Sequence, residues 1–126
     1  MAKRKNALMQ TLAMDGRLEE AEALKVLSEA ARAATHTLPA ALAKCTTQEQ
    51  MQKVIADRDA VMLAYTNSLV RSLRNTGPLF EQTAQDLDGA TATVLAEAKN
   101  LKTDIQAIGL LADLVRLASA LALAFA

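Results

Sequence analysis

Residues 109–126 read GLLADLVRLASALALAFA, and they raise the question of what this apolar C-terminal segment packs against. Asp113 and Arg116 are its only fully charged side chains. A soluble protein rarely exposes a continuous apolar segment of this length to water. We therefore expect residues 109–126 to form a helix that is buried against another part of the protein.

A heptad pattern extends upstream from this segment over residues 79–125. Uncharged residues recur from Phe80 at alternating steps of four and three, and the larger ones are Phe80, Leu87, Val94, Leu101, Ile105, Ile108 and Val115. No proline interrupts the pattern. A heptad repeat of this length is typical of supercoiled helix packing, so the sequence predicts one long, coiled-coil-like C-terminal helix.

Helix start and stop signals divide the rest of the chain. Leu38-Pro39 predicts a helix end, because a residue before proline avoids the helical conformation. Thr46 and Glu49 form a Thr-x-x-Glu capping box that predicts the next helix start, and residues 75–78, NTGP, predict a tight antiparallel turn.

The sequence therefore predicts an all-α fold, an antiparallel bundle of three main helices at about 17–35, 47–75 and 79–125. The whole chain, 1–126, forms a single domain, in which residues 1–14 are a frayed segment or a separate short helix. We interpret the basic start of the chain as an ordinary helix start and not as a signal peptide.

Composition argues against several classes of function. The 126 residues carry 14 basic and 14 acidic side chains, so no net charge attracts nucleic acid. Cys45 and His36 are the only residues of their kinds, which excludes an intrachain disulfide and a cysteine or histidine metal cage. We expect no metal, no cofactor and no enzymatic activity.

A short resemblance surrounds His36. Residues 34–38, ATHTL, resemble the phosphorylatable-histidine segment of histidine phosphotransfer domains, which are helical bundles of about this length. The family pattern continues with lysine and glycine along an uninterrupted helix, whereas this chain has Pro39 and Ala40. Because we expect Pro39 to end the helix, we do not assign the chain to this family.

An apolar stripe on the second helix is expected to face the third. Its members lie within a narrow arc of the helical wheel: Met51, Ile55, Met62, Tyr65, Leu69 and Leu73. Arg58 projects from the middle of this stripe. We expect Arg58 either to extend its charged end to solvent or to pair with an acid of the third helix such as Glu97 or Asp104, and the alternative is an anion or partner site inside the bundle.

A second apolar row begins on the third helix at the point beyond which we expect the second helix to be too short to contact it. It consists of Leu110, Leu114, Leu117, Leu121 and Phe125. Because a second chain could cover this row, the sequence predicts a homo-oligomer interface, with a symmetric dimer favoured.

Two functions from different classes follow. The first is a non-enzymatic, self-associating interaction protein that acts as an adaptor, a chaperone-like protein or an assembly subunit, with a protein partner and a cytoplasmic location. Secretion by a route that needs no signal peptide is compatible with it. The alternative is a membrane-active protein whose apolar C-terminal helix inserts into lipid, although Asp113 and Arg116 lie within that helix.

Overall fold

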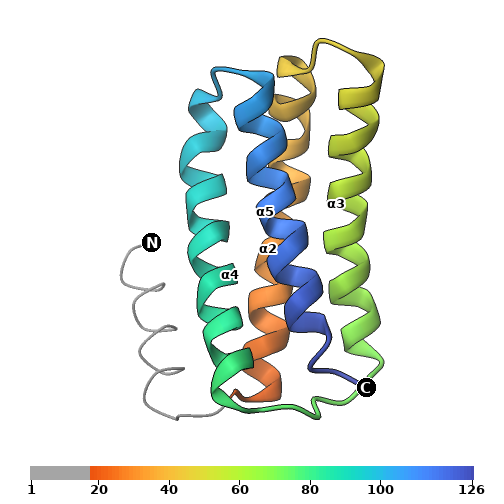
Figure 1. Ribbon diagram of the computed structural model, residues 1–126, viewed down its shortest axis with the longest axis vertical. Coiled ribbons are helices and arrows are strands. Elements are labelled where there is room, and N and C mark those ends of the chain that lie inside the picture. The colour runs from red at the N-terminus through yellow and green to blue at the C-terminus, as the bar shows by residue number, and fades with distance from the viewer. Residues whose placement is uncertain (1–17) are drawn as a thin grey trace.

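Four helices make up most of the part of the chain that the computed structural model describes, residues 18–126. They are α2 (Glu20–Lys44), α3 (Gln48–Leu69), α4 (Pro78–Glu97) and α5 (Asp104–Ala122), as Figure 1 shows. The all-α class is confirmed. The prediction of three main helices is wrong, because the region 79–125 forms two of them. The prediction for residues 1–14 lies outside the described residues.

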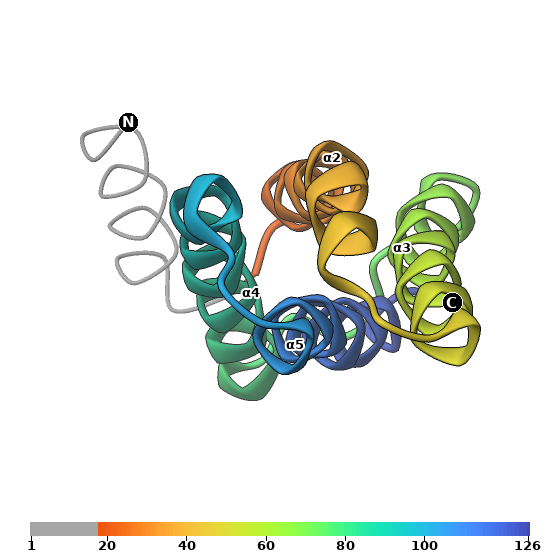
Figure 2. The same cartoon turned by 90° about the horizontal axis from the view of Figure 1, so that it is seen from above.

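The helices form two antiparallel hairpins, α2–α3 and α4–α5, that pack against each other. α2 and α4 run upward in Figure 1, and α3 and α5 run downward. The view from above shows α2 and α5 in the middle, in contact with each other, while α3 and α4 lie on opposite flanks (Figure 2). The sequence predicts that the helix at 47–75 packs along the helix at 79–125. This is wrong for α4, which lies on the opposite flank from α3, and correct only for α5, which contacts α3.

The expected long helix is interrupted by a short 3-10 turn, Ala98–Asn100, and by extended residues at 101–103. Thr103 caps the new helix, because its Oγ1 accepts the N–H of Gln106 at 3.0 Å. In return, the Gln106 side-chain oxygen accepts the N–H of Lys102 at 2.8 Å. A threonine cap with a polar side chain three residues later satisfies N–H groups that open a helix, and it needs neither proline nor glycine.

The start of α3 uses the same arrangement. Thr47 Oγ1 accepts the N–H of Gln50 at 3.1 Å, and the Gln50 side-chain oxygen accepts the N–H of Thr46 at 2.7 Å. The helix begins where the sequence predicts. The expected capping pair, Thr46 with Glu49, is displaced by one residue, because glutamine can accept the same hydrogen bond as glutamate.

α2 continues through Pro39 to Lys44, so the predicted helix end at Leu38 is wrong. Proline removes one backbone hydrogen bond to the residue four positions earlier, Thr35. Both Pro39 and Thr35 lie on the exposed side of α2. The next turn carries Ala41, which is fully buried. Burial of this turn offsets the missing hydrogen bond.

A segment at the lower end of the bundle, residues 70–77, crosses from α3 to α4. Ser72 donates to and accepts from Ala126 through the backbone, at 3.1 and 2.9 Å. The N–H of Arg74 donates to the carbonyl of Ala124 at 2.8 Å. The C-terminal residues thus satisfy backbone groups of the crossing segment, which would otherwise need water.

Alanine lets the other helices approach α2 closely. The buried alanines of α2 are Ala23, Ala30, Ala31, Ala33, Ala34 and Ala41. The centre between the helices is filled by fully buried leucines, which include Leu27, Leu87, Leu111, Leu114 and Leu121. The small alanines of α2, together with large residues from α2, α4 and α5, give the interdigitated packing typical of protein cores.

Candidate interaction surface

The apolar row that the sequence assigns to an oligomer interface lies mostly inside the chain's own core. Leu114 and Leu121 are fully buried, Phe125 exposes 4% and Leu117 exposes 8% of its surface. Leu110 is partly buried and packs against the same core. Because α5 contacts α2, α3 and α4, this apolar row is covered within one chain.

The row is covered because α5 folds back into the middle of the bundle after the break at 101–103. The prediction of an interface there assumed an unbroken helix that extends beyond its partner. Since the row is already buried, it offers no surface for a second chain.

The buried face of α3 also differs from the expected one. The residues that face the core are Val54, Asp57, Val61, Ala64 and Ser68. This face is rotated from the predicted one by about one residue step, roughly 100°. The expected apolar stripe consequently lies on the outside of the bundle.

The polar members of the buried face are satisfied locally. Asp57 accepts two hydrogen bonds from Nζ of Lys53, at 2.7 and 2.8 Å. Ser68 Oγ donates to the carbonyl of Ala64 at 2.8 Å. Buried polar groups that find partners on their own helix remove most of the penalty for facing the core. This is why a face with two polar residues can be buried.

We call the exposed set the outer stripe of α3, defined as Met51, Ile55, Arg58, Met62, Tyr65 and Leu69. Met51, Ile55 and Met62 expose 38–39% of their surfaces, and Leu69 exposes 50%. Tyr65 is partly buried against the core. Leu73, the last residue of the expected stripe, lies beyond α3 and forms a bridge with Phe125. Apart from Arg58, the outer stripe is therefore a line of large, partly exposed, mainly apolar side chains along one helix.

Arg58 lies in the middle of the outer stripe and not inside the bundle. Its Nε donates to Oδ1 of Asp59 at 2.8 Å, and the two side chains expose 26% and 56% of their surfaces. Neither Glu97 nor Asp104 is its partner, contrary to the expected pairing. An ion pair between neighbouring residues at the surface adds little stability.

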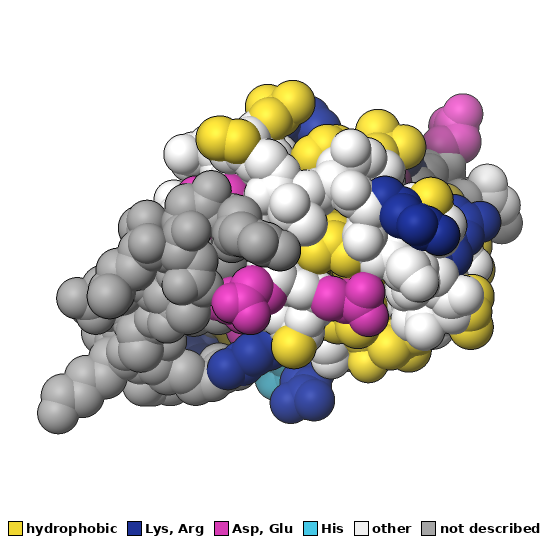
Figure 3. Space-filling model, turned by 90° about the horizontal axis from the view of Figure 1, so that it is seen from below, with side chains coloured by type: hydrophobic (Ala, Val, Ile, Leu, Met, Phe, Trp, Pro, Cys, Tyr) yellow, Lys and Arg dark blue, Asp and Glu magenta, His cyan; other side chains and the backbone are white. Residues whose placement is uncertain are grey.

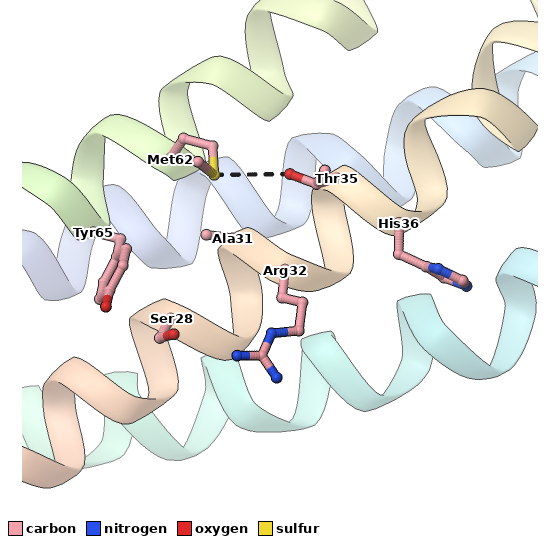
Figure 4. A pocket seen from close by; sticks show the side chains of 7 residues that line it. All are labelled: Ser28, Ala31, Arg32, Thr35, His36, Met62 and Tyr65. Carbon is pink, nitrogen blue, oxygen red and sulfur yellow. Dashed lines mark hydrogen bonds between the residues drawn. The ribbon is translucent and has the colours of Figure 1, made fainter.

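A shallow groove runs beside the outer stripe, between α2 and α3. Its volume is about 380 Å³, and its lining residues are Ser28, Ala31, Arg32, Thr35, His36, Met62 and Tyr65 (Figure 4). Thr35 Oγ1 donates a weak hydrogen bond to the Met62 sulfur at 3.7 Å. The small side chains of Ser28 and Ala31 leave the α2 wall hollow, whereas Arg32 and His36 extend toward α4. The groove thus combines an apolar floor with one charged side chain, Arg32, at its edge.

His36 lies in the middle of α2, and its side chain is exposed to solvent. The expectation that Pro39 ends the helix after it is wrong. Proline and alanine still replace the lysine and glycine of the phosphotransfer pattern. The resemblance stays limited to residues 34–38, and we assign no phosphotransfer role to His36.

Cys45 lies at the upper end of the groove-forming hairpin, where α2 ends. Its Sγ donates to the carbonyl of Ala41 at 3.3 Å. Burial, and to a smaller extent the negative charge of Asp104, raises the pKa of the Cys45 thiol above its ordinary value. A thiol that stays protonated is a poor nucleophile. In the part of the chain described, no group of histidine, cysteine and carboxylate side chains could hold a metal ion.

Of the other large exposed apolar side chains in the described part of the chain, Leu63, Leu95 and Ile105 are scattered over α3, α4 and α5, and three more lie at the lower end of the molecule. Val70, Leu79 and Leu123 lie there, where the chain crosses between α3 and α4 and where α5 ends. From below, hydrophobic side chains are interspersed with charged and polar ones (Figure 3). They do not form a line along one helix as the outer stripe does.

α5 is the one helix among residues 18–126 that is long and apolar enough to cross a membrane by length and composition. Its 19 residues have a mean hydropathy of 1.6 over the most apolar window. One third of the residues in that window are buried inside the bundle.

Comparison with family models, with curated proteins and with solved structures finds no match to this chain.

Proposed function

We propose that this protein is a non-enzymatic interaction module that binds an α-helix along the outer stripe of α3 and the adjoining groove. The observation that supports this proposal is the linear arrangement of Met51, Ile55, Met62 and Leu69, all of which are at least 38% exposed. Their spacing of three and four residues, completed by Arg58 and Tyr65, is that of a helix-packing seam. Such a seam on a surface indicates an interaction site.

The groove gives the proposed site a shape. A helix that lies along α3 places its own side chains into the hollow over Ser28 and Ala31. Amphipathic helices bind hydrophobic grooves in this way, with anchors at intervals of three and four residues. An adaptor, a chaperone-like protein and an assembly subunit all use this mode of binding.

A defined helical peptide tests the site without knowledge of the natural partner. The probe is a fluorescent peptide with leucine at heptad positions a and d and with glutamate and lysine elsewhere. We expect the full chain to bind it, as measured by fluorescence anisotropy, and the Ile55→Glu/Met62→Glu variant to bind at least about tenfold more weakly. Backbone amide signals of residues 51–69 should shift in NMR spectra when the peptide is added.

The matched control is Leu63→Glu, which places a charge on the same helix at an exposed leucine outside the stripe. This variant should bind the peptide as the native chain does. Equal binding by the native chain and the stripe variant would contradict the proposal, and so would the absence of binding at a concentration at which the native chain is a monomer.

A second candidate function is insertion of α5 into lipid, which its length and composition favour. α5 would have to leave the bundle, because its buried leucines are part of the core. Flotation of the full chain with vesicles of phosphatidylcholine, alone or mixed with phosphatidylglycerol, tests this function. A chain that does not float with either vesicle contradicts it.

A further inference from the structure

The outer stripe of α3 has the same spacing when it is read in either direction. Its six positions, 51, 55, 58, 62, 65 and 69, are separated by four, three, four, three and four residues. A two-fold symmetric interface requires a surface that is complementary to itself, so that residue i meets residue j and j meets i. The stripe fulfils this condition for two antiparallel helices whose two-fold axis passes near residue 60.

That axis brings together three pairs, each of which occurs twice: Met51 with Leu69, Ile55 with Tyr65, and Arg58 with Met62. The two outer pairs are apolar on both sides. In the inner pair, the methylene groups of Arg58 can pack on Met62 while the guanidinium points to the edge of the interface. No pair sets two like charges directly opposite each other.

The charges beside the axis are also self-complementary. Arg58 and Asp59 are neighbours in the middle of α3 and form an ion pair within one chain. Two antiparallel copies place two arginines and two aspartates around the axis, with a total charge of zero. Each Arg58 then lies near the Asp59 of both chains, and opposite charges across an interface fix its register.

We infer that the occupant of the outer stripe is a second copy of this chain, docked with its α3 antiparallel to the first. This inference rests on the proposed function, since it names the partner of the same site. α3 has 22 residues and is therefore about 33 Å long. A helix of that length, together with the adjoining α2 wall, gives space for the roughly 800 Å² per partner that stable interfaces bury.

A charge-exchange experiment tests the inference with the full chain. Asp59→Arg sets four positive charges around the axis of a homodimer, and Arg58→Asp sets four negative charges there. We expect the native chain to be a dimer in light scattering after size exclusion, and each variant alone to be a monomer. An equal mixture of the two variants should again form dimers, because the charges of the mixed pair are complementary.

Both substituted side chains are partly exposed, at 26% and 56%, so the variants are expected to keep the native helix content in circular dichroism. A monomeric native chain overturns the inference, and so does a mixture that stays monomeric. Variants that each remain dimeric overturn it as well, because the dimer must then use another surface. A second copy on the outer stripe competes with the peptide, so the proposed function is tested separately by peptide binding to the Asp59→Arg variant, which is expected to be a monomer with an open stripe.

Disulfide cross-linking tests the direction of the two helices. One chain carries Met51→Cys and the other Leu69→Cys, both in a Cys45→Ser background, with diamide as the oxidant. The antiparallel arrangement predicts that the mixed disulfide between positions 51 and 69 dominates, because only cysteines with close Cα atoms are bridged. Dominant disulfides between identical positions, or equal amounts of all products, overturn the arrangement.

Discussion

The Gln50 side chain donates a hydrogen bond of 2.7 Å from Nε2 to Oδ2 of Asp104, and so it joins the first turn of α3 to the first residue of α5. The orientation of the amide follows from its other end, which accepts the N–H of Thr46. α3 and α5 are neighbouring parallel helices, and this bond fixes their starts at the same level. It connects two segments that are 54 residues apart in the sequence.

This bond gives the stability of the protein a dependence on pH. The hydrogen bond from Gln50, with that from the N–H of Ile105, holds the pKa of Asp104 below its ordinary value of 3.8. The unfolded chain then binds a proton at a higher pH than the folded chain, so stability falls as the pH drops below about 4. We expect the thermal midpoint of Asp104→Asn to fall less steeply between about pH 5 and pH 2 than that of the native chain. Parallel curves for the two proteins would contradict this role of Asp104.

The two threonine caps predict a matched pair of stability effects. Thr47→Ala and Thr103→Ala each remove an oxygen that accepts a backbone N–H in the first turn of a helix. Each should lower the free energy of unfolding by about 1 kcal/mol, measured by urea denaturation. Thr66→Ala is the control, because Thr66 lies in the middle of α3, away from both helix ends, and is exposed to solvent. This substitution should change the free energy of unfolding by less than about 0.5 kcal/mol. A Thr103→Ala variant as stable as the native chain would show that the cap does not hold the start of α5.

Substitution of Leu114 distinguishes a core residue from an interface residue. Leu114 is fully buried, so Leu114→Ala should lower the free energy of unfolding by about 2–5 kcal/mol. Leu114→Asp should abolish the helical signal in circular dichroism, because a buried charge without a partner unfolds a small domain. Leu123→Asp, at an exposed leucine beyond the end of α5, should stay folded. A folded, monomeric Leu114→Asp variant would restore the interface that the sequence predicts.

Several features of the fold could be predicted from local signals. The Gly77–Pro78 pair opens α4 as expected, and the start of α3 lies within a residue of its predicted position. The predicted end of the second helix at about residue 75, with a tight turn after it, is wrong, because α3 ends at Leu69. The break at 101–103 was missed because the heptad pattern continues across it, and Leu101 is buried as a heptad position requires. A threonine cap without proline or glycine is a weak signal when it competes with such a pattern.

The site could be predicted only in part, because sequence hydrophobicity and burial disagree on α3. Met51, Ile55 and Met62 form the more apolar stripe, and the core takes the face with Asp57 and Ser68 instead. Asp57 is satisfied by Lys53 on its own helix, a contact that periodicity does not reveal. Which face of a helix is buried depends on the positions of three other helices, and the break before α5 decides those positions.

The last prediction concerns Pro39. A helix that continues through Pro39 and a helix that ends at Leu38 predict opposite changes in the free energy of unfolding when Pro39 is replaced by alanine. Because α2 continues to Lys44, Pro39→Ala restores a backbone hydrogen bond to Thr35 and removes the clash of the proline ring. The interior cost of proline relative to alanine is about 3 kcal/mol, and the greater freedom of the unfolded chain offsets about 1 kcal/mol of it. We expect Pro39→Ala to raise the free energy of unfolding by about 2 kcal/mol. If the helix ended at Leu38, the same substitution would lower it, so urea denaturation of this one variant decides where α2 ends.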